Sequence, residues 1–225
     1  MSLTQPDKDK LHADYLKLIE FYHKKVKEIV VASERGDPKQ RISIPAVIEI
    51  RSAFDHVAST HAVMYDCDIN NSLAESGLSS YDYCSKNLDK AHGHLYRAAY
   101  DAYDVIAISL QEEIEKLINS ISREALFAVV PDAVNKIYNP YHEARKLVTK
   151  EKIYKDVTSR AEEEKQFIQY EKATNHLLDV EKTIRKYMPA LIEYNKEKNP
   201  WQKLAIVGFI ATILSTIIAI WALYK

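Results

Sequence analysis

Glycine and cysteine are both scarce in this chain, with four glycines and two cysteines among 225 residues. The alternation of apolar and polar residues that predicts β-strands is also absent. Glu, Lys, Leu and Ala instead recur with helical period, so we expect an all-α helical bundle of long antiparallel helices. Cys67 and Cys84 are too far apart for a CxxC pair and have no flanking histidine at zinc-ligand spacing. We therefore expect no metal site.

The sequence motifs of several common enzyme classes are missing. The chain has no GxxxxGK[ST], GxGxxG, HExxH or GxSxG sequence, so nucleotide hydrolysis, dinucleotide redox chemistry, zinc proteolysis and serine hydrolysis have no support. We expect no cofactor. The formal net charge of −1 predicts no bulk attraction to nucleic acid, although it leaves a local basic patch open. The polar N-terminus has no apolar run typical of a secretion signal, so we expect the N-terminal domain to lie in the cytoplasm.

Apolar residues three and four positions apart predict a series of helices. Gly36 and Pro38 end the first of them. Residues 65–80 are rich in Asn, Asp, Ser and Gly and are interpreted as a loop. Pro131 and Pro140 then break the chain into short pieces, because each lacks a backbone amide hydrogen. The predicted helices cover residues 5–33, 44–64, 81–121 and 141–198.

The last of these helices carries the most regular apolar pattern. Its heptad seam suits either an antiparallel neighbour in a bundle or a second copy of the chain. Pro189 is expected to kink or divide this helix near Arg185. We expect a helical bundle over 1–130, a heptad-bearing segment over 131–200 that packs on the bundle or a partner, and an anchor over 201–225. The seam consists of Tyr170, Ala173, Leu177, Val180, Ile184, Tyr187, Leu191 and Tyr194.

A long uncharged apolar run covers residues 204–223. As a helix, about 20 residues span the hydrocarbon core of a bilayer, which is about 30 Å thick. Trp201 and Trp221 bracket the run, as expected at membrane interfaces, and Lys198 and Lys203 precede it. Burial in a protein core is the alternative, but a globular helix of this length normally has a polar face. We expect one C-terminal transmembrane helix in the inner (cytoplasmic) membrane, with membrane lipid as its partner.

The predicted helix over 44–64 contains Arg51 and His56, with four residues between them. A surface imidazole beside a local ion pair between Arg51 and Asp55 explains this pattern without any function. Alternatively, the face meets a second copy of the chain, so that two arginines and two histidines converge. His56 then exchanges a proton with a ribose hydroxyl or the leaving oxygen, while Arg51 neutralises the phosphate without a metal. The stripe expected to face the core contains Val47, Ile50, Phe54, Val57 and His61, with Arg51 at its edge and His56 pointing away.

The phrase IEIRSAFDHVAS, followed in the next predicted helix by KAHGHLYRAAYDAYDVI, resembles the HEPN superfamily over about residues 10–120. The resemblance implies a helical, dimerising domain; many members are RNases of bacterial toxin, anti-phage and CRISPR-associated systems, and many others are inactive binding modules. It also implies that Arg51 and His56 are the catalytic pair of the family's R-x4-6-H motif. Ser52 follows the arginine where the family favours Asn, Asp or His.

The predicted helix over 81–121 contributes a second pair of basic residues. His94 and Arg97 lie one turn apart and could help to hold a substrate phosphate. An ion pair between Arg97 and Asp101, with tyrosines packed at the edge of the core, explains the same residues without a ligand.

Three functions are consistent with these features. The first is a tail-anchored, homo-oligomeric, HEPN-like protein of bacterial stress or anti-phage defence that cuts RNA at Arg51 and His56. The second is a non-catalytic effector or sensor, in which a regulatory protein bound to the helical domain controls membrane disruption by the C-terminal helix. The third is a membrane-tethered scaffold.

Overall fold

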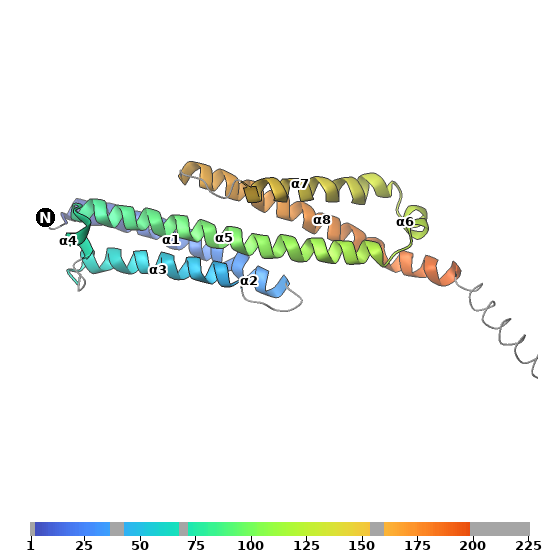
Figure 1. Ribbon diagram of the computed structural model, residues 1–225, viewed down its shortest axis with the longest axis horizontal. Helices are drawn as coiled ribbons and strands as arrows, with labels where there is room; N and C mark the ends of the chain where they lie inside the picture. The colour runs from blue at the N-terminus through green and yellow to red at the C-terminus, as the bar shows by residue number, and fades with distance from the viewer. Residues whose placement is uncertain (1–2, 37–42, 68–71, 154–159, 199–225) are drawn as a thin grey trace, which may run out of the picture.

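The structure is a computed structural model that describes residues 3–36, 43–67, 72–153 and 160–198 (Figure 1). Within these ranges the chain forms helices and contains no strand, which confirms the all-α prediction. The elements in chain order are α1 (Gln5–Phe21), η1 (Tyr22–Val26), α2 (Lys27–Gly36), α3 (Ile44–Met64), α4 (Ser72–Ser76), α5 (Ser80–Asn119), α6 (Arg123–Val129), η2 (Val134–Tyr138), α7 (Asn139–Ile153) and α8 (Arg160–Lys198).

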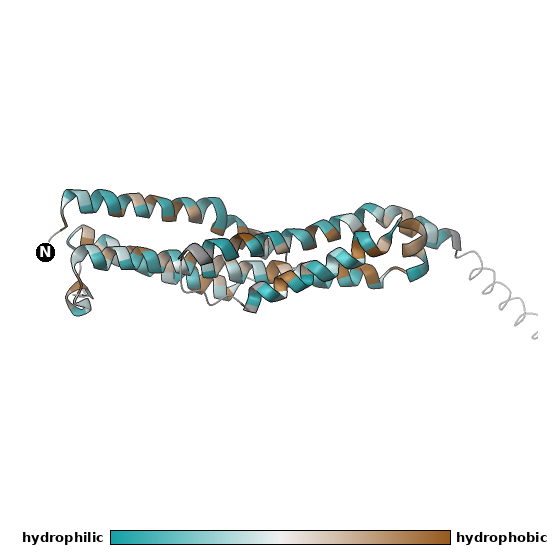
Figure 2. Cartoon of the chain, turned by 90° about the horizontal axis from the view of Figure 1, so that it is seen from above, coloured by the Kyte–Doolittle hydropathy of each residue, from teal (hydrophilic) through white to brown (hydrophobic). Residues whose placement is uncertain are grey.

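The helix α5 is the central element of an elongated bundle (Figure 1). The helices α1, α2 and α3 pack along one part of α5, α8 packs along another part, and α7 packs mainly on α8. The N-terminus and the end of α8 lie at opposite ends of the bundle. Hydrophobic and hydrophilic residues alternate along each helix (Figure 2), and the buried hydrophobic residues of the described helices form two core clusters.

Local sequence signals account for the starts of several helices. A capping box joins Thr4 and Asp7 at the start of α1, and Ser79 accepts a hydrogen bond of 3.1 Å from the amide of Asp82 at the start of α5. Ser122 caps α6 in the same way. Each such cap satisfies an amide that the helix itself leaves unpaired and contributes about 1 kcal/mol.

The helix predicted over 5–33 contains one π-helical turn, η1, between α1 and α2. A π turn inserts one extra residue into the helix and so shifts the side chains that follow it. Leu18 and Val26 are eight positions apart, and the extra residue brings them onto the same face, where both are buried. Ile29 and Val30 continue this buried face.

The helix α3 packs on α5 through small residues, and the core-facing stripe predicted for it is confirmed only at Ile50 and Val57, which pack against the core. Val47 and Phe54 are 45% and 68% exposed, whereas Ala46, Ala53 and Thr60 are buried at seven-residue spacing. Small side chains on both helices let the two backbones approach closely, so this face packs inward, while Ile44, Val47, Ile48 and Phe54 are exposed. The small residues that α5 contributes to the same core are Ala91, Ala98, Ala99, Ala102 and Ala107.

The segment predicted as one helix over 141–198 forms two helices, α7 and α8, which pack against each other in opposite directions (Figure 1). The heptad seam of α8 therefore faces α7, which runs antiparallel to it, and also α5. An antiparallel neighbour in the bundle was one of the two partners predicted for this seam. Pro189 does not divide α8. It removes one backbone hydrogen bond from an exposed position, and the buried Ile184 and Leu191 anchor the helix on either side.

The predicted transmembrane segment, 204–223, lies outside the described residues. In the part of the chain that the structure describes, no helix combines the length and the apolar character needed to cross a bilayer. The membrane anchor therefore stays a prediction.

The small-residue contact between α3 and α5 predicts a sharp response to side-chain size. Ala53→Leu should lower the free energy of unfolding by about 1–3 kcal/mol, because the added atoms force the two helices apart. Ala190→Leu, at an exposed position of α8, should change it by no more than about 0.5 kcal/mol. Urea denaturation followed by circular dichroism measures both. Equal effects of the two substitutions would contradict close packing at Ala53.

Candidate functional site

Three of the four predicted site residues lie together between α3 and α5. His56 extends from α3, and His94 and Arg97 extend from α5; the rings of His56 and His94 stack with their centroids 5.2 Å apart and their planes at 23°. Two further residues that the sequence did not suggest, Glu49 and Asn87, complete this group. These five residues are called the histidine cluster below.

His56 is held by Asn87. Its Nδ1 lies 2.8 Å from Asn87 Oδ1, and the amide nitrogen of Asn87 donates to the carbonyl of Tyr83 at 2.9 Å. Asn87 Oδ1 therefore accepts, and His56 Nδ1 carries a proton. In the neutral imidazole, Nε2 is then the unprotonated atom, which has the form of a general base.

The pKa of His56 is lower than that of a free histidine. Partial burial is the main cause, since it disfavours the charged form, and the nearby His94 and Lys90 act in the same direction. The hydrogen bond to Asn87 opposes this shift. His56 is therefore predominantly neutral at neutral pH, as a general base must be.

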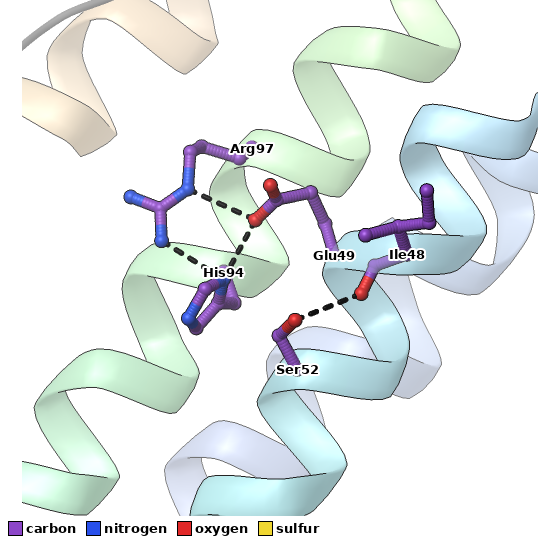
Figure 3. A network of polar contacts seen from close by, with 5 residues as sticks. All are labelled: Ile48, Glu49, Ser52, His94 and Arg97. Atoms are coloured by element: carbon purple, nitrogen blue, oxygen red, sulfur yellow. Dashed lines mark hydrogen bonds and ion pairs between the residues drawn. The ribbon is translucent and has the colours of Figure 1, made fainter.

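Glu49 ties together the two basic residues of α5 (Figure 3). One of its oxygens, Oε2, lies 2.7 Å from His94 Nδ1 and 2.9 Å from Arg97 Nε. Arg97 Nη2 also lies 2.9 Å from His94 Nδ1. A protonated Nδ1 donates to Glu49, whereas an unprotonated Nδ1 accepts from Arg97.

Partial burial alone would raise the pKa of Glu49, but the hydrogen bonds and positive charges of His94 and Arg97 outweigh burial and lower it. Glu49 is therefore ionised at neutral pH. Arg97 forms an ion pair, as the alternative without a ligand predicted. Its partner in this ion pair is Glu49 of α3. The sequence pattern that could have identified Glu49 is its position seven residues before His56, because this spacing places both residues on the same side of the helix.

Arg51 lies apart from the histidine cluster. His56 follows Arg51 by five positions, which rotates their side chains by about 140° relative to each other around the axis of α3. Arg51 is exposed, and no described residue forms an ion pair with it, including Asp55. Within one copy of the chain, the predicted catalytic pair is therefore not brought together.

The chemistry available to the histidine cluster is limited by Glu49. A phosphate that approached His94 and Arg97 would meet a carboxylate that already neutralises the arginine. No group of three or more His, Cys, Asp or Glu side chains within the described ranges could hold a metal ion. Burial raises the pKa of the Cys84 thiol to about 11, so it is a poor nucleophile at neutral pH.

The tyrosines of α5 belong to the core, as the packing alternative predicted. Tyr96, Tyr100 and Tyr103 are buried and pack on Phe167 of α8. Tyr170 of α8 is fully buried and donates a hydrogen bond to Asp104. These rings are therefore not available for stacking on unpaired bases.

The histidine cluster predicts two separate regions of pH-dependent stability. Since the pKa of His56 is lowered on folding, the unfolded chain binds its proton first, and the free energy of unfolding falls as the pH drops below about 6.5. The ionised Glu49 stabilises the fold above pH 4.5, and this contribution is lost as the pH falls further.

Denaturant titrations between pH 2 and pH 8 measure these contributions. We expect His56→Gln to flatten the dependence just below pH 6.5 and Glu49→Gln to flatten it below pH 4.5. If His56→Gln and the unsubstituted protein show the same slope between pH 5 and 6.5, the lowered pKa of His56 is wrong.

Comparison with known proteins adds no family to these observations. No family model, no curated protein and no solved structure matches the chain.

Proposed function

We propose that this protein is a membrane-anchored effector or sensor that acts by assembly of its helical domain, without catalysis. The observation that carries the proposal is the exposed outer face of α3, which is apolar and complementary to itself. A second copy of the chain is the partner that fits this face. Assembly of the helical domains then sets the spacing between the C-terminal apolar segments, 204–223, of the two copies.

The outer face of α3 is formed by the large side chains that the close contact with α5 leaves outside. Ile44 and Phe54 are 66% and 68% exposed, and Val47 and Ile48 are about half exposed. Contiguous exposed apolar side chains are typical of protein interfaces. Arg51 lies in the middle of this face and is also exposed.

The residues of this face are arranged so that two copies of α3 fit in opposite directions. If the two-fold axis crosses the outer face of α3 at the level of Ala53, Arg51 of each copy lies opposite Asp55 of the other, which gives two ion pairs. The same register places large residues opposite small ones. The facing residues are Ile44 and Ala62, Ile48 and Ala58, and Arg51 and Asp55. A closed dimer requires this kind of self-complementary surface.

The bundle also provides a physical connection between this face and the predicted anchor. The helix α5 contacts both α3 and α8, and α8 runs to Lys198, six residues before Leu204. The end of α8 lies far from the start of α1 (Figure 1). Since α8 runs opposite to α3 in the bundle (Figure 1), pairing of two bundles through α3 in opposite directions sets the two predicted membrane segments far apart, at the two ends of one assembly.

A charge exchange tests the dimer. In Arg51→Asp, the new carboxylate of each copy faces Asp55 of the other, and we expect the dimer to dissociate at least about tenfold more readily, equivalent to about 1.4 kcal/mol. The double variant Arg51→Asp/Asp55→Arg should restore the dimer, because the two charges exchange places. Sedimentation equilibrium of the full chain in density-matched detergent measures the dissociation constants.

Lys86→Asp provides the control, since it makes the same change of charge at an exposed position of α5. It should leave the dissociation constant unchanged. Unchanged association of Arg51→Asp, or a double variant no better than the single one, would mean that the chain does not pair in this register.

A metal-independent, HEPN-like ribonuclease of bacterial defence is the second candidate. It is supported by the convergence of His56, His94 and Arg97, with Nε2 of His56 unprotonated. The proposed dimer would place Arg51 of a second copy beside Asp55, one residue before His56. RNA is the substrate that this arrangement requires.

Expression in bacteria distinguishes the two candidates. We expect the intact chain to lower the membrane potential and slow growth, and truncation after Lys198 to abolish both effects. His56→Ala should leave both effects in place, because assembly does not use its imidazole. Membrane potential, growth and RNA integrity are followed together for each variant.

The ribonuclease predicts the reverse pattern. If His56→Ala stops RNA decay and restores growth while the truncated chain remains toxic, the effector proposal is wrong. His56→Gln is included as a control for folding, because its amide retains a donor for Asn87. A variant that has lost activity but not thermal stability identifies a catalytic contribution of His56.

A further inference from the structure

A groove with a volume of about 690 Å³ lies between α2, α5 and α8, apart from the histidine cluster. Sites for small molecules usually have volumes of about 300–1,000 Å³. The groove follows α8 from Thr174 to Arg185, a length of about 17 Å at the rise of an α-helix. It is therefore long enough for an extended small molecule.

The walls of the groove are mostly apolar. Ile106 and Leu110 of α5 and Leu178 of α8 line it and remain partly exposed. Ile29 of α2 adds a buried side chain at one end. A molecule with an apolar body would remove these surfaces from water, which is favourable in proportion to the area covered.

The hydroxyl of Thr174 has no described hydrogen-bond partner, although its side chain is only 4% exposed. A threonine within a helix commonly donates to the carbonyl four residues earlier, but Thr174 makes no such bond. A buried hydroxyl without a partner is unfavourable. Since Thr174 lines the groove, a polar group of a bound molecule is positioned to complete its hydrogen bonding.

The charges of the groove are predominantly negative. Glu28, Glu113, Glu181 and Arg185 line it, so three carboxylates face a single guanidinium. Arg185 donates to Glu113 at 2.9 Å and also to Glu181, which neutralises much of the charge at that end. No described cation forms an ion pair with Glu28.

Glu28 and Thr174 lie at the same end of the groove. Lys25 Nζ and Glu171 Oε1 are 3.2 Å apart, and this ion pair joins η1, just before α2, to α8. Three residues further along each helix, about one turn, are Glu28 and Thr174. The carboxylate and the unpaired hydroxyl therefore define a polar end, and the apolar wall extends from it toward Arg185.

We infer that this groove binds an elongated apolar molecule that ends in a positively charged amine. The ammonium group donates hydrogen bonds to Glu28 and Thr174, and the apolar body covers Ile106, Leu110 and Leu178. Charge complementarity excludes a carboxylate in the place of the amine. This site is independent of the proposed dimer face on α3.

Three ligands that differ only in their terminal group test the site: 4-phenylbutylamine, 4-phenylbutanol and 4-phenylbutanoate. Isothermal titration with the full chain in lipid nanodiscs measures each affinity, and empty nanodiscs give the background. We expect the amine to bind at least about tenfold more tightly than the alcohol, because a hydrogen bond to a charged group is stronger than a neutral one. The carboxylate should not bind.

Substitutions locate the bound amine. Glu28→Gln should weaken binding of the amine about tenfold or more and leave the alcohol unaffected. Thr174→Val has nearly the same shape; it should weaken amine binding severalfold and raise the melting temperature of the ligand-free protein. Glu112→Gln, an exposed carboxylate of α5 outside the groove, should change neither. Equal binding of the three ligands, or unchanged amine binding in Glu28→Gln, would overturn the inference.

Discussion

The close contact between α3 and α5 determines most of what is distinctive in this protein. Ala46, Ala53 and Thr60 bury little apolar area individually, but their size lets two backbones approach closely over several turns. At that distance, polar side chains at the rim reach across to the other helix, as Glu49 does to His94. The same contact leaves Ile44, Val47, Ile48 and Phe54 of α3 exposed to solvent. The histidine cluster and the outer face of α3 are thus two consequences of one packing arrangement.

The second organising element is the length of α5. Its 40 residues extend about 60 Å, so one rigid helix contacts α3 at one end of the bundle and α8 toward the other. The rings of Phe21, Tyr96 and Phe167 meet where α1, α5 and α8 come together. Pairing through α3 and binding of a molecule in the groove along α8 therefore both act on the same core. This continuity is the physical basis of the proposed sensor or effector function.

Prediction from sequence was most accurate where local interactions decide the outcome. The predicted bounds of α3 match the structure, and those of α5 differ by one residue at the start and two at the end, because Pro45 in the first turn of α3 and the Ser79 cap of α5 act on their immediate neighbours. The predicted effect of Pro189 on α8 was too large, because packing on either side of this exposed proline offsets the one lost hydrogen bond. The division between α7 and α8 was missed because helical periodicity continues through both. Of the site, His56, His94 and Arg97 were found and do meet, whereas Glu49 and Asn87 were not foreseen.

The sequence alone was sufficient for the all-α class and for most helix boundaries, because backbone hydrogen bonds, caps and apolar periodicity are properties of neighbouring residues. It was insufficient for choosing the buried face of α3. Helical periodicity offers both a large apolar stripe and a small-residue stripe, and only the shape of the opposing helix selects between them. Because Ala53 faces α5, Arg51 points to solvent and His56 points to Asn87. The separation of these two residues is therefore a property of the tertiary structure.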